Sequence, residues 1–474
     1  MHFRCWASLL ALLGSACGSS AEHRGKTVLF ASGADLQSIN PLLTIHPLAR
    51  QVQRYVLLTT LARYDSALTP RPYLARRWEW SSNHTRLTFH LETRIPWHDG
   101  QPTTARDVAW TLEAARDPAT GYPRAGELEQ LDSARDIDDS TVVLTFRSAP
   151  ASFPDVLTDL AILPAHLLDS VPHASLRQAQ WNVTPIGNGP FRFASHEPNR
   201  RWVFVADSGF PQALGGPPKL DRFIVVVVDE PTTKLAALVS GELDFAGIQP
   251  AHAEFVRRDP DLQVVSYPLL MTYGIVFNTR RAPFDRLAVR LALSRAIDRE
   301  ELVAGYAYGF GTPAEGPVPP SAPHYLPIAA GPEPSSSPPS SQRLGFELLT
   351  VGSGEAALEQ MVQARLRSAG FDLTIRQLEL SAFLARVYGS HDFQAAVVGT
   401  PGDLGLGYLA PLAALAGIDV PSDPEAAQRI FADSMPVAFL YHARGLQGMN
   451  RRVHGVAMDL RGELPTVHDW WVSR

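Results

Sequence analysis

A chain of 474 residues is too long for one hydrophobic core, which stops growing at roughly 250–300 residues, so we expect two or three lobes. A net charge of −6, with 19% charged and 45% hydrophobic residues, excludes a strongly basic nucleic-acid-binding protein and a highly charged disordered chain. The chain has two cysteines, Cys5 and Cys17, both near its start, which excludes a disulfide framework or a thiolate metal cluster in the body of the protein.

The N-terminus has the pattern of an export signal. His2 and Arg4 precede an apolar stretch over residues 6–13, and three small residues separate that stretch from Cys17. The apolar stretch is too short to span a bilayer as a mature helix. Residues 1–17 are therefore predicted to be a signal peptide.

Cys17 after three small residues resembles a bacterial lipobox, although Leu13 lies four residues before the cysteine where lipoboxes usually place it three before. We expect lipidation at Cys17, followed by a small, polar tether over 18–25. Ordinary cleavage near Ala16 or Ala21 is the alternative. No later stretch approaches the roughly 20 apolar residues of a membrane helix, so any membrane attachment is expected through lipid only.

Hydrophobic periodicity and turn residues predict the elements along the rest of the chain. A Pro- and Ser-rich break at 329–342 predicts a loop or linker. The mixture of strands and helices, which alternate in the last third, indicates an α/β protein with mixed sheets. In chain order we predict a strand over 26–33, a helix over 47–63, strands over 86–93 and 140–148, a hairpin over 191–207, a strand over 221–230, a helix and short strand within 231–246, a strand over 272–279, a long helix over 285–306, a strand–helix–strand unit over 346–380 and a strand over 394–400.

The stretch IPWHDGQPTTARDVAWTLEAARDP (95–118) places histidine, acidic and basic residues close together, but its pattern favours scaffolding over an active site. Asp99-Gly100 is a turn dipeptide. Thr104 and Asp107 fit a variant capping box, with Asp in place of Glu, at the start of a helix. Val108, Leu112 and Ala115 would form the buried face of that helix.

Catalytic motifs are absent from the sequence. It contains no G-x-S-x-G, H-E-x-x-H or C-x-x-C motif, no P-loop and no Rossmann glycine pattern. Its 15 histidines show no metal-ligand spacing. We therefore predict neither an enzyme nor a bound metal or cofactor.

Five blocks of the sequence are similar, in the same order, to patterns typical of the family 5 extracellular solute-binding proteins, the peptide, oligopeptide and nickel receptors of ABC importers. Within the third block, Asn188 stands where the family usually has threonine. The blocks are PYLARRWEWSSNHTRLTFHLE (72–92), WHDGQPTTARDVAWTLEAARDP (97–118), NVTPIGNGPFRF (182–193), the stretch 215–246 ending in SGELDFA, and VFNTRRAPFDRLAVRLALSRAIDREELV (276–303).

This resemblance implies an α/β fold of the periplasmic-binding-protein type II-like class, with two lobes joined by a hinge and a subdomain inserted in the first lobe. Lobe I would take residues 26–65, 187–268 and 447–474, and the inserted subdomain residues 66–186. Lobe II would take residues 269–446, which is shorter than in typical family members.

The resemblance also implies a function: extracytoplasmic capture of a small polar ligand, most simply a short peptide, for delivery to an ABC permease. The protein would be a monomer that binds no nucleic acid, located in the periplasm or on the outer face of the cell membrane through its lipid anchor. A degenerate, sensory or scaffold lipoprotein of the same fold and a receptor for a nickel chelate remain alternatives. An exported hydrolase is the least favoured.

Five residues are candidates for contact with the ligand. In peptide-binding relatives an Asp after a strand of lobe II neutralises the α-amino group, and the matching residue is Asp403, which could instead only organise its glycine-rich turn. Tyr273 could face the cleft or pack in the core. Thr44 and His46 match cleft-lining backbone, with an exposed loop as the alternative, and Tyr408 is the fifth candidate.

The sequence leaves two kinds of ligand contact undecided. His46 and His391 could approach a nickel chelate, but their spacing does not argue for it. No arginine can be assigned to a ligand carboxylate.

Overall fold

The computed structural model describes residues 25–44, 46–150, 152–327, 343–352, 354–421 and 423–473. The predicted signal peptide, the lipidation site Cys17, nearly all of the tether and the predicted Pro- and Ser-rich loop lie outside these ranges.

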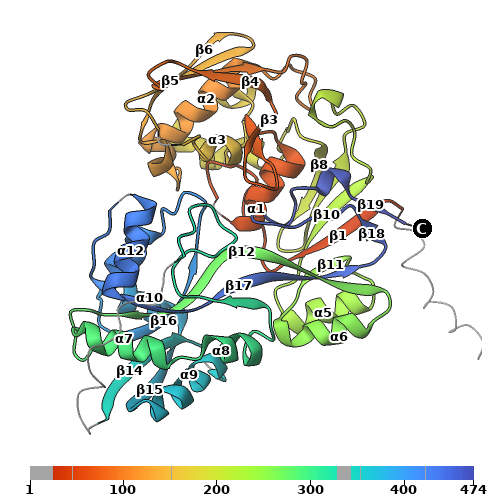
Figure 1. Cartoon of the computed structure of the whole chain (residues 1–474). Helices are drawn as coiled ribbons and strands as arrows, with labels where there is room; N and C mark the ends of the chain where they lie inside the picture. Colours follow the sequence, from red (N-terminus) through yellow and green to blue (C-terminus); the bar gives the residue numbers. More distant parts are fainter. Residues whose placement is uncertain are drawn as a thin grey trace, which may run out of the picture.

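One large mixed sheet runs through the whole molecule (Figure 1). Its eleven strands follow the order β15-β14-β16-β12-β17-β11-β1-β10-β9-β8, and β13 pairs with β17. The strands are β1 Thr27–Ser32, β8 Phe191–Glu197, β9 Arg201–Ala206, β10 Arg222–Val227, β11 Phe245–Gly247, β12 Leu262–Phe277, β13 Gly311–Pro313, β14 Leu344–Val351, β15 Phe371–Leu378, β16 Ala395–Pro401 and β17 Val437–Asn450.

Strands β12 and β17 are long enough to serve both halves of this sheet. Residues 262–268 of β12 pair with residues 444–450 of β17, and residues 272–276 pair with 437–442, with a register shift after Pro268. We call the half that contains β1 and β8–β11 lobe I, and the half that contains β13–β16 lobe II. The predicted strand over 272–279 is the second half of β12. This two-stranded ribbon joins the lobes, and the irregular stretch after Pro268 is where the chain can bend.

A smaller antiparallel sheet, in the order β4-β5-β7-β6, lies on top of lobe I in Figure 1 and forms the inserted subdomain with helix α2. Its strands are β4 Ala75–Trp80, β5 Arg86–Leu91, β6 Leu131–Asp138 and β7 Thr141–Phe146, and α2 spans Ala105–Arg116. The predicted capping box is confirmed, because the Asp107 carboxylate accepts the Thr104 N–H at 2.8 Å and the Thr104 side chain caps the Asp107 N–H. Asp107 is buried and also accepts from Ala165 N and Trp97 Nε1, so its task is structural.

Helices cover both faces of lobe II and one side of lobe I. In lobe II, α7–α9 pack on one core cluster and α11 and α12 on another. The remaining elements are α1 Pro47–Val52, α3 Val156–Asp159, α4 Ala165–Leu168, α5 Pro231–Val239, α6 Ala253–Arg258, α7 Leu287–Ala296, α8 Arg299–Gly305, α9 Ala357–Ser368, α10 Leu380–Leu384, α11 Leu409–Ala416, α12 Pro424–Ser434, and the short strands β2 Ala62–Tyr64, β3 Pro70–Pro72, β18 Val453–His454 and β19 Trp471–Val472.

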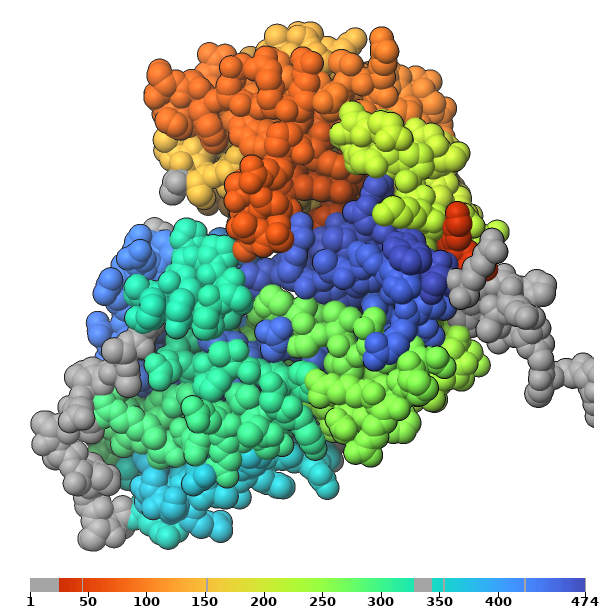
Figure 2. Space-filling model, turned by 45° about the vertical axis from the view of Figure 1, so that its right-hand side comes forward, coloured from red at the N-terminus to blue at the C-terminus, as the bar shows by residue number. Residues whose placement is uncertain are grey.

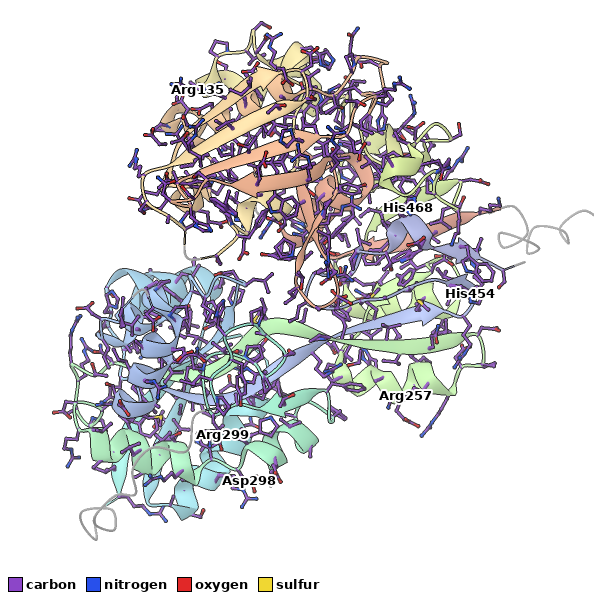
Figure 3. The ribbon with its side chains drawn as sticks, turned by 45° about the horizontal axis from the view of Figure 1, so that its top comes forward. Arg135, Arg257, Asp298, Arg299, His454 and His468 are labelled. Carbon is purple, nitrogen blue, oxygen red and sulfur yellow. The ribbon has the colours of Figure 1, made fainter. Side chains whose placement is uncertain are left out.

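The inserted subdomain and lobe II face each other across a furrow. Figure 2 shows this furrow between the orange and yellow upper body and the teal and blue surface of lobe II. In Figure 1, α1 lies above the β12–β17 ribbon on the side of this furrow, whereas α5 and α6 lie below the ribbon. On that lower side, Arg257 of α6, labelled in Figure 3, lies over the ring of Phe310 in lobe II at 5.1 Å.

The prediction of one helix over 47–63 is wrong beyond Leu57. The helix α1 continues as a π-helical turn over Gln53–Leu57, and the chain is then extended until β2. Tertiary bonds replace helical ones at this point: the Leu57 carbonyl accepts from Gly189 N at 2.8 Å, and Thr59 N donates to Asn188 Oδ1 at 2.9 Å. The apolar pattern continues beyond the helix because the extended residues are also buried.

The prediction of one long helix over 285–306 is also wrong, because α7 ends at Ala296 and α8 begins at Arg299. Asp298 caps α8, its side chain accepting the Glu301 N–H at 2.9 Å. The Arg299 guanidinium donates to the carbonyls of Ala314 and Phe439, both at 2.8 Å. Figure 3 labels Asp298 and Arg299 at the start of α8. Arg299 also donates to the Ser294 carbonyl at 3.0 Å, so the break lets one arginine bind three segments of lobe II.

Helices long and apolar enough to cross a lipid bilayer do not occur in the ranges that the structure describes.

Candidate functional site

The lobe II wall of the furrow carries a glycine-rich loop directly after β16. Strands β14, β15 and β16 are parallel, and loops at the carboxyl ends of parallel strands are the usual place for ligands. Asp403 lies two residues after the end of β16 and is exposed. Its Oδ1 accepts the Gly407 N–H at 3.0 Å, so one oxygen organises the loop. Its other oxygen, Oδ2, forms no hydrogen bond within the described part of the chain.

Tyr408 belongs to the same loop, so the structure brings two of the predicted site residues together. Its hydroxyl donates to the Pro317 carbonyl at 3.0 Å. Burial raises the pKa of Tyr408, and the nearby charge of Asp403 raises it further. The ring therefore stays neutral and forms a half-buried wall beside the carboxylate.

Asp155 of the inserted subdomain faces this loop. A Cβ atom placed on Gly405 would lie 3.5 Å from Oδ2 of Asp155, so the loop approaches the subdomain closely. Tyr64 donates to the other oxygen of Asp155. Burial raises the pKa of Asp155 against that hydrogen bond, and the charges of Glu127 and Asp403 raise it further. Two carboxylates from opposite sides of the furrow thus repel each other, and a cation between them would relieve the repulsion.

Three guanidinium groups surround one buried carboxylate beside this acidic pair. Arg50, Arg54 and Arg124 all bind Asp159, whose side chain is only 7% exposed. The other edge of Arg124 binds Glu127 at 2.5 and 2.6 Å. Burial lowers the pKa of Arg50, while Tyr122, Glu127 and Asp403 oppose that shift. The charge of Asp403 in lobe II is therefore among those that act on Arg50.

Thr44 and His46 lie at the start of α1 and have capping roles. The Thr44 hydroxyl accepts the His46 N–H at 3.1 Å, and His46 Nδ1 accepts the Ala49 N–H at 3.3 Å. Burial lowers the pKa of His46, partly offset by the charge of Asp35. These two residues position the helix from which Arg50 projects.

Tyr273 lies within lobe II. It pairs with Gly399 of β16 and with Tyr441 of β17, and its ring stacks on Tyr441 with centroids 5.0 Å apart. The pair belongs to the core cluster under α7–α9. The structure therefore gives Tyr273 a packing contact, which was the alternative to a cleft position.

Arg50, Asp155 and Asp159 did not appear among the residues predicted from the sequence. The only local signal is spacing: Arg50 and Arg54 stand four residues apart on one helix, as do Asp155 and Asp159 around α3. Such spacing is common on helices. Only the approach of α1 to α3 reveals that these pairs meet.

A metal site has no support in the geometry of the described residues. No three His, Cys, Asp or Glu side chains there come together as a ligand set. His391 has its backbone carbonyl bound by Asn278 Nδ2 at 3.0 Å, and His46 caps α1.

A second hollow lies elsewhere on lobe II, lined by Arg280, Arg281, Ala282, Glu347, Arg386, Phe393 and Gln394. Arg281 binds Asp392 at 2.7 Å and Arg386 binds Glu347 at 2.9 Å, so these charges are compensated within lobe II. The hollow touches neither β12 nor lobe I, and a ligand bound there would not join the lobes.

His442 lies in the ribbon next to the register shift, paired with Thr272, and its Nδ1 is 2.9 Å from Thr272 Oγ1. The residue is 4% exposed, and burial lowers its pKa to about 4. Since the folded-state pKa lies below that of an unfolded histidine, the neutral ring stabilises the fold above pH ~6.5, and this stability is lost as the pH falls toward 4.

We expect the His442→Gln variant to lose less stability than the wild type between pH 7 and pH 5, by up to about 2 kcal/mol. Urea unfolding at several pH values would measure this difference. His84→Asn, on an exposed turn, is the control and should follow the wild type. Parallel pH profiles for wild type and His442→Gln would contradict the assignment.

A family model described as bacterial extracellular solute-binding proteins, family 5 Middle, matches residues 69–411. The chain is 31% identical over 242 residues to an ABC transporter peptide-binding protein of Brucella ovis, covering 51% of this chain and 45% of that protein. It is 27% identical over 334 residues to heme-binding protein A of Haemophilus influenzae, covering 65% and 60%. The chain thus matches about half the length of these relatives.

The structure superposes on the ABC transporter substrate-binding protein CtaP from Listeria monocytogenes with a TM-score of 0.82. The superposition covers 95% of this chain and 100% of that one at 18% sequence identity, so it bears on the fold alone. It confirms the predicted α/β class with two lobes.

Proposed function

Because the chain belongs to the bacterial extracellular solute-binding proteins of family 5, as the match over residues 69–411 shows, we propose that it binds a short peptide and delivers it to an ABC permease. The relatives are named for different ligands, peptide in one case and heme in another. The choice of a peptide for this chain therefore depends on its own furrow.

The observation that supports a peptide is the position of Asp403 opposite Asp155. Asp155 lies close to the Asp403 loop and the two charges raise each other's cost, so an ammonium group between them would add to the compensation that Arg124 already gives Asp155. A peptide α-amino group would be compensated by both carboxylates, and each partner would offset the desolvation of the other. Asp403 is the proposed main contact, and the half-buried ring of Tyr408 would line the same subsite.

The two lobes would close on the bound ligand. A ligand shifts the equilibrium toward a closed form only through contacts that differ between open and closed states. An ammonium held by Asp403 from lobe II and Asp155 from the subdomain on lobe I makes such contacts. The ribbon of β12 and β17 would absorb the motion near Pro268.

The cellular setting belongs to the same proposal. The receptor would work as a monomer outside the cytoplasm, held to the membrane by a lipid on Cys17, and would present its peptide to the permease. It would bind rather than cleave, because the furrow residues are paired carboxylates and guanidiniums rather than a nucleophile with a base.

Native mass spectrometry of the chain from Gly18, purified without refolding, tests the proposal. We expect released masses that match short peptides. Added peptide should also raise the unfolding temperature, since a ligand at about 100 times its Kd stabilises by about 2.7 kcal/mol. A protein that carries nothing and does not respond to a peptide pool would overturn the proposal.

A further inference from the structure

We propose that the hollow on lobe II is a second binding site, separate from the furrow, for an anion of the phosphate class. The proposal does not depend on the ligand of the furrow. The hollow has a volume of about 600 Å³, which is within the range of pockets that hold small molecules. Three of the residues that line it are arginines, Arg280, Arg281 and Arg386, and one, Glu347, is acidic.

The hollow lies at the opposite edge of the lobe II sheet from the furrow. Asp403 comes after the last residue of β16, whereas Phe393 and Gln394 of the hollow precede the first residue of that strand. The seven residues of β16 span roughly 20 Å in an extended strand. A ligand in the hollow would therefore bind without contact with the furrow.

Arg280 brings a positive charge to the hollow that no carboxylate compensates. It is exposed, and its guanidinium forms no hydrogen bond or ion pair within the described part of the chain. The side chain lies over the end of α11, because a Cβ atom placed on Gly417 would be 2.9 Å from Arg280 Nε. The C-terminal end of a helix carries a partial negative charge, which favours a cation without neutralising it. The N–H donors of Arg280 thus remain available to a ligand.

Arg281 and Arg386 are bound on one side only. Arg281 Nη1 binds Asp392 at 2.7 Å. Arg386 donates to Glu347 with Nη2 at 2.9 Å, and to the Asp392 carbonyl with Nε at 2.8 Å. Among the described residues, no hydrogen bond uses Nε or Nη2 of Arg281 or Nη1 of Arg386. Both arginines therefore keep donors for a ligand while their carboxylate partners hold them in place.

The charges around the hollow do not cancel. Arg376 also binds Glu347, at 3.2 Å, so the three lining arginines and Arg376 have two carboxylates between them, Glu347 and Asp392. This cluster keeps an excess of two positive charges in a protein whose net charge is −6. A phosphate group carries about two negative charges at neutral pH, and its oxygens match the planar fork of arginine donors. A phosphate group would thus neutralise the excess.

Amide side chains hold the hollow in shape without a ligand. Gln394 donates to the Ala282 carbonyl with Nε2 and accepts the Glu347 N–H with Oε1, both at 2.9 Å. Asn278 Oδ1 accepts the Arg280 N–H at 3.1 Å. The loop after β12 is thus fixed to β14, so a ligand would not have to order the backbone that carries its donors.

Calorimetric titration of inorganic pyrophosphate into the chain from Gly18, in chloride at physiological ionic strength, tests the proposal. We expect one saturable site per chain. Arg280→Gln should weaken the binding about 10-fold or more, as for the loss of a hydrogen bond between charged groups. Because the Arg280 side chain binds no other described residue, the unfolding temperature of this variant without pyrophosphate should equal that of the wild type.

Two control variants locate the binding. Arg429→Gln removes an arginine that is 63% exposed on α12 of lobe II and pairs with Glu425. Arg50→Gln alters the other arginine cluster, which surrounds Asp159. Both variants should bind pyrophosphate as the wild type does, and their unfolding temperatures would be recorded alongside.

Lipid vesicles distinguish the two sources of a phosphate group. The same chain would be sedimented with phosphatidylglycerol vesicles, and with phosphatidylcholine vesicles as the reference. Binding to phosphatidylglycerol that Arg280→Gln loses would assign the hollow to a lipid headgroup. Binding of pyrophosphate without binding to vesicles would assign it to a soluble phosphate compound.

Three results would overturn the proposal. The first is a wild type that binds neither pyrophosphate nor phosphatidylglycerol vesicles. The second is an Arg280→Gln variant that binds both as tightly as the wild type. The third is a loss of pyrophosphate binding in Arg50→Gln but not in Arg280→Gln, which would place the anion at the cluster around Asp159. None of these results bears on the proposed binding of peptides.

Discussion

The Asp403→Asn variant is expected to bind peptides with a free α-amino group about 100-fold more weakly than the wild type. The substitution removes the negative charge but keeps an oxygen at Oδ1, which can still accept the Gly407 N–H that organises the loop. The loss would therefore report on charge rather than on loop geometry. Calorimetric titration with the peptides recovered from the native protein measures the change.

Two controls make this result specific. N-acetyl peptides lack the ammonium, so the wild type and Asp403→Asn should bind them with the same low affinity. Asp132→Asn removes a carboxylate that is 57% exposed on the subdomain surface and should leave binding unchanged. An Asp403→Asn protein that binds free peptides as tightly as the wild type would show that Asp403 only shapes its turn.

Gly187→Ala is expected to lower the free energy of unfolding by about 3 kcal/mol or more. A Cβ atom at this position would lie 2.0 Å from the Leu57 carbonyl oxygen and 2.7 Å from its Cδ1. The backbone cannot move away easily, because the Gly187 carbonyl accepts the His98 N–H at 2.7 Å and Gly189 N donates to Leu57. Urea unfolding followed by circular dichroism would measure the loss.

The matched control for that substitution is Gly126→Ala, where an added Cβ meets no atom within 4 Å. Its midpoint should stay close to that of the wild type. An unchanged urea midpoint for Gly187→Ala would mean that the contact with Leu57 relaxes without cost.

Elements whose ends are determined locally could be predicted from the sequence. The capping box of Thr104 and Asp107 starts α2 where the pattern indicates, and the hairpin of β8 and β9 turns at Asn199, which has a positive φ. Helix ends determined by distant residues were predicted wrongly. The helix at 47–63 ends at Leu57 because of Gly189 and Asn188.

The charged residues around the furrow also differ in whether the sequence alone could predict them. Asp403 was proposed from the resemblance to peptide-binding relatives, and Tyr408, five residues later, was a separate candidate. Arg50 and Asp159 are separated by 109 residues, and neither has a neighbour in sequence that indicates a binding role. The pairing of Arg50 with Asp159 could therefore be identified only once α1 and α3 were seen in contact.

The sequence by itself determined the class of this protein: the order of its five blocks and its alternating strands and helices sufficed for the two-lobed α/β fold and the solute-binding family. Those signals are local, because apolar periodicity, turn residues and caps act within a few residues. Only the tertiary structure decided which charges share the furrow, since Asp403 and Asp155 come from segments that meet only when lobe II and the subdomain are folded.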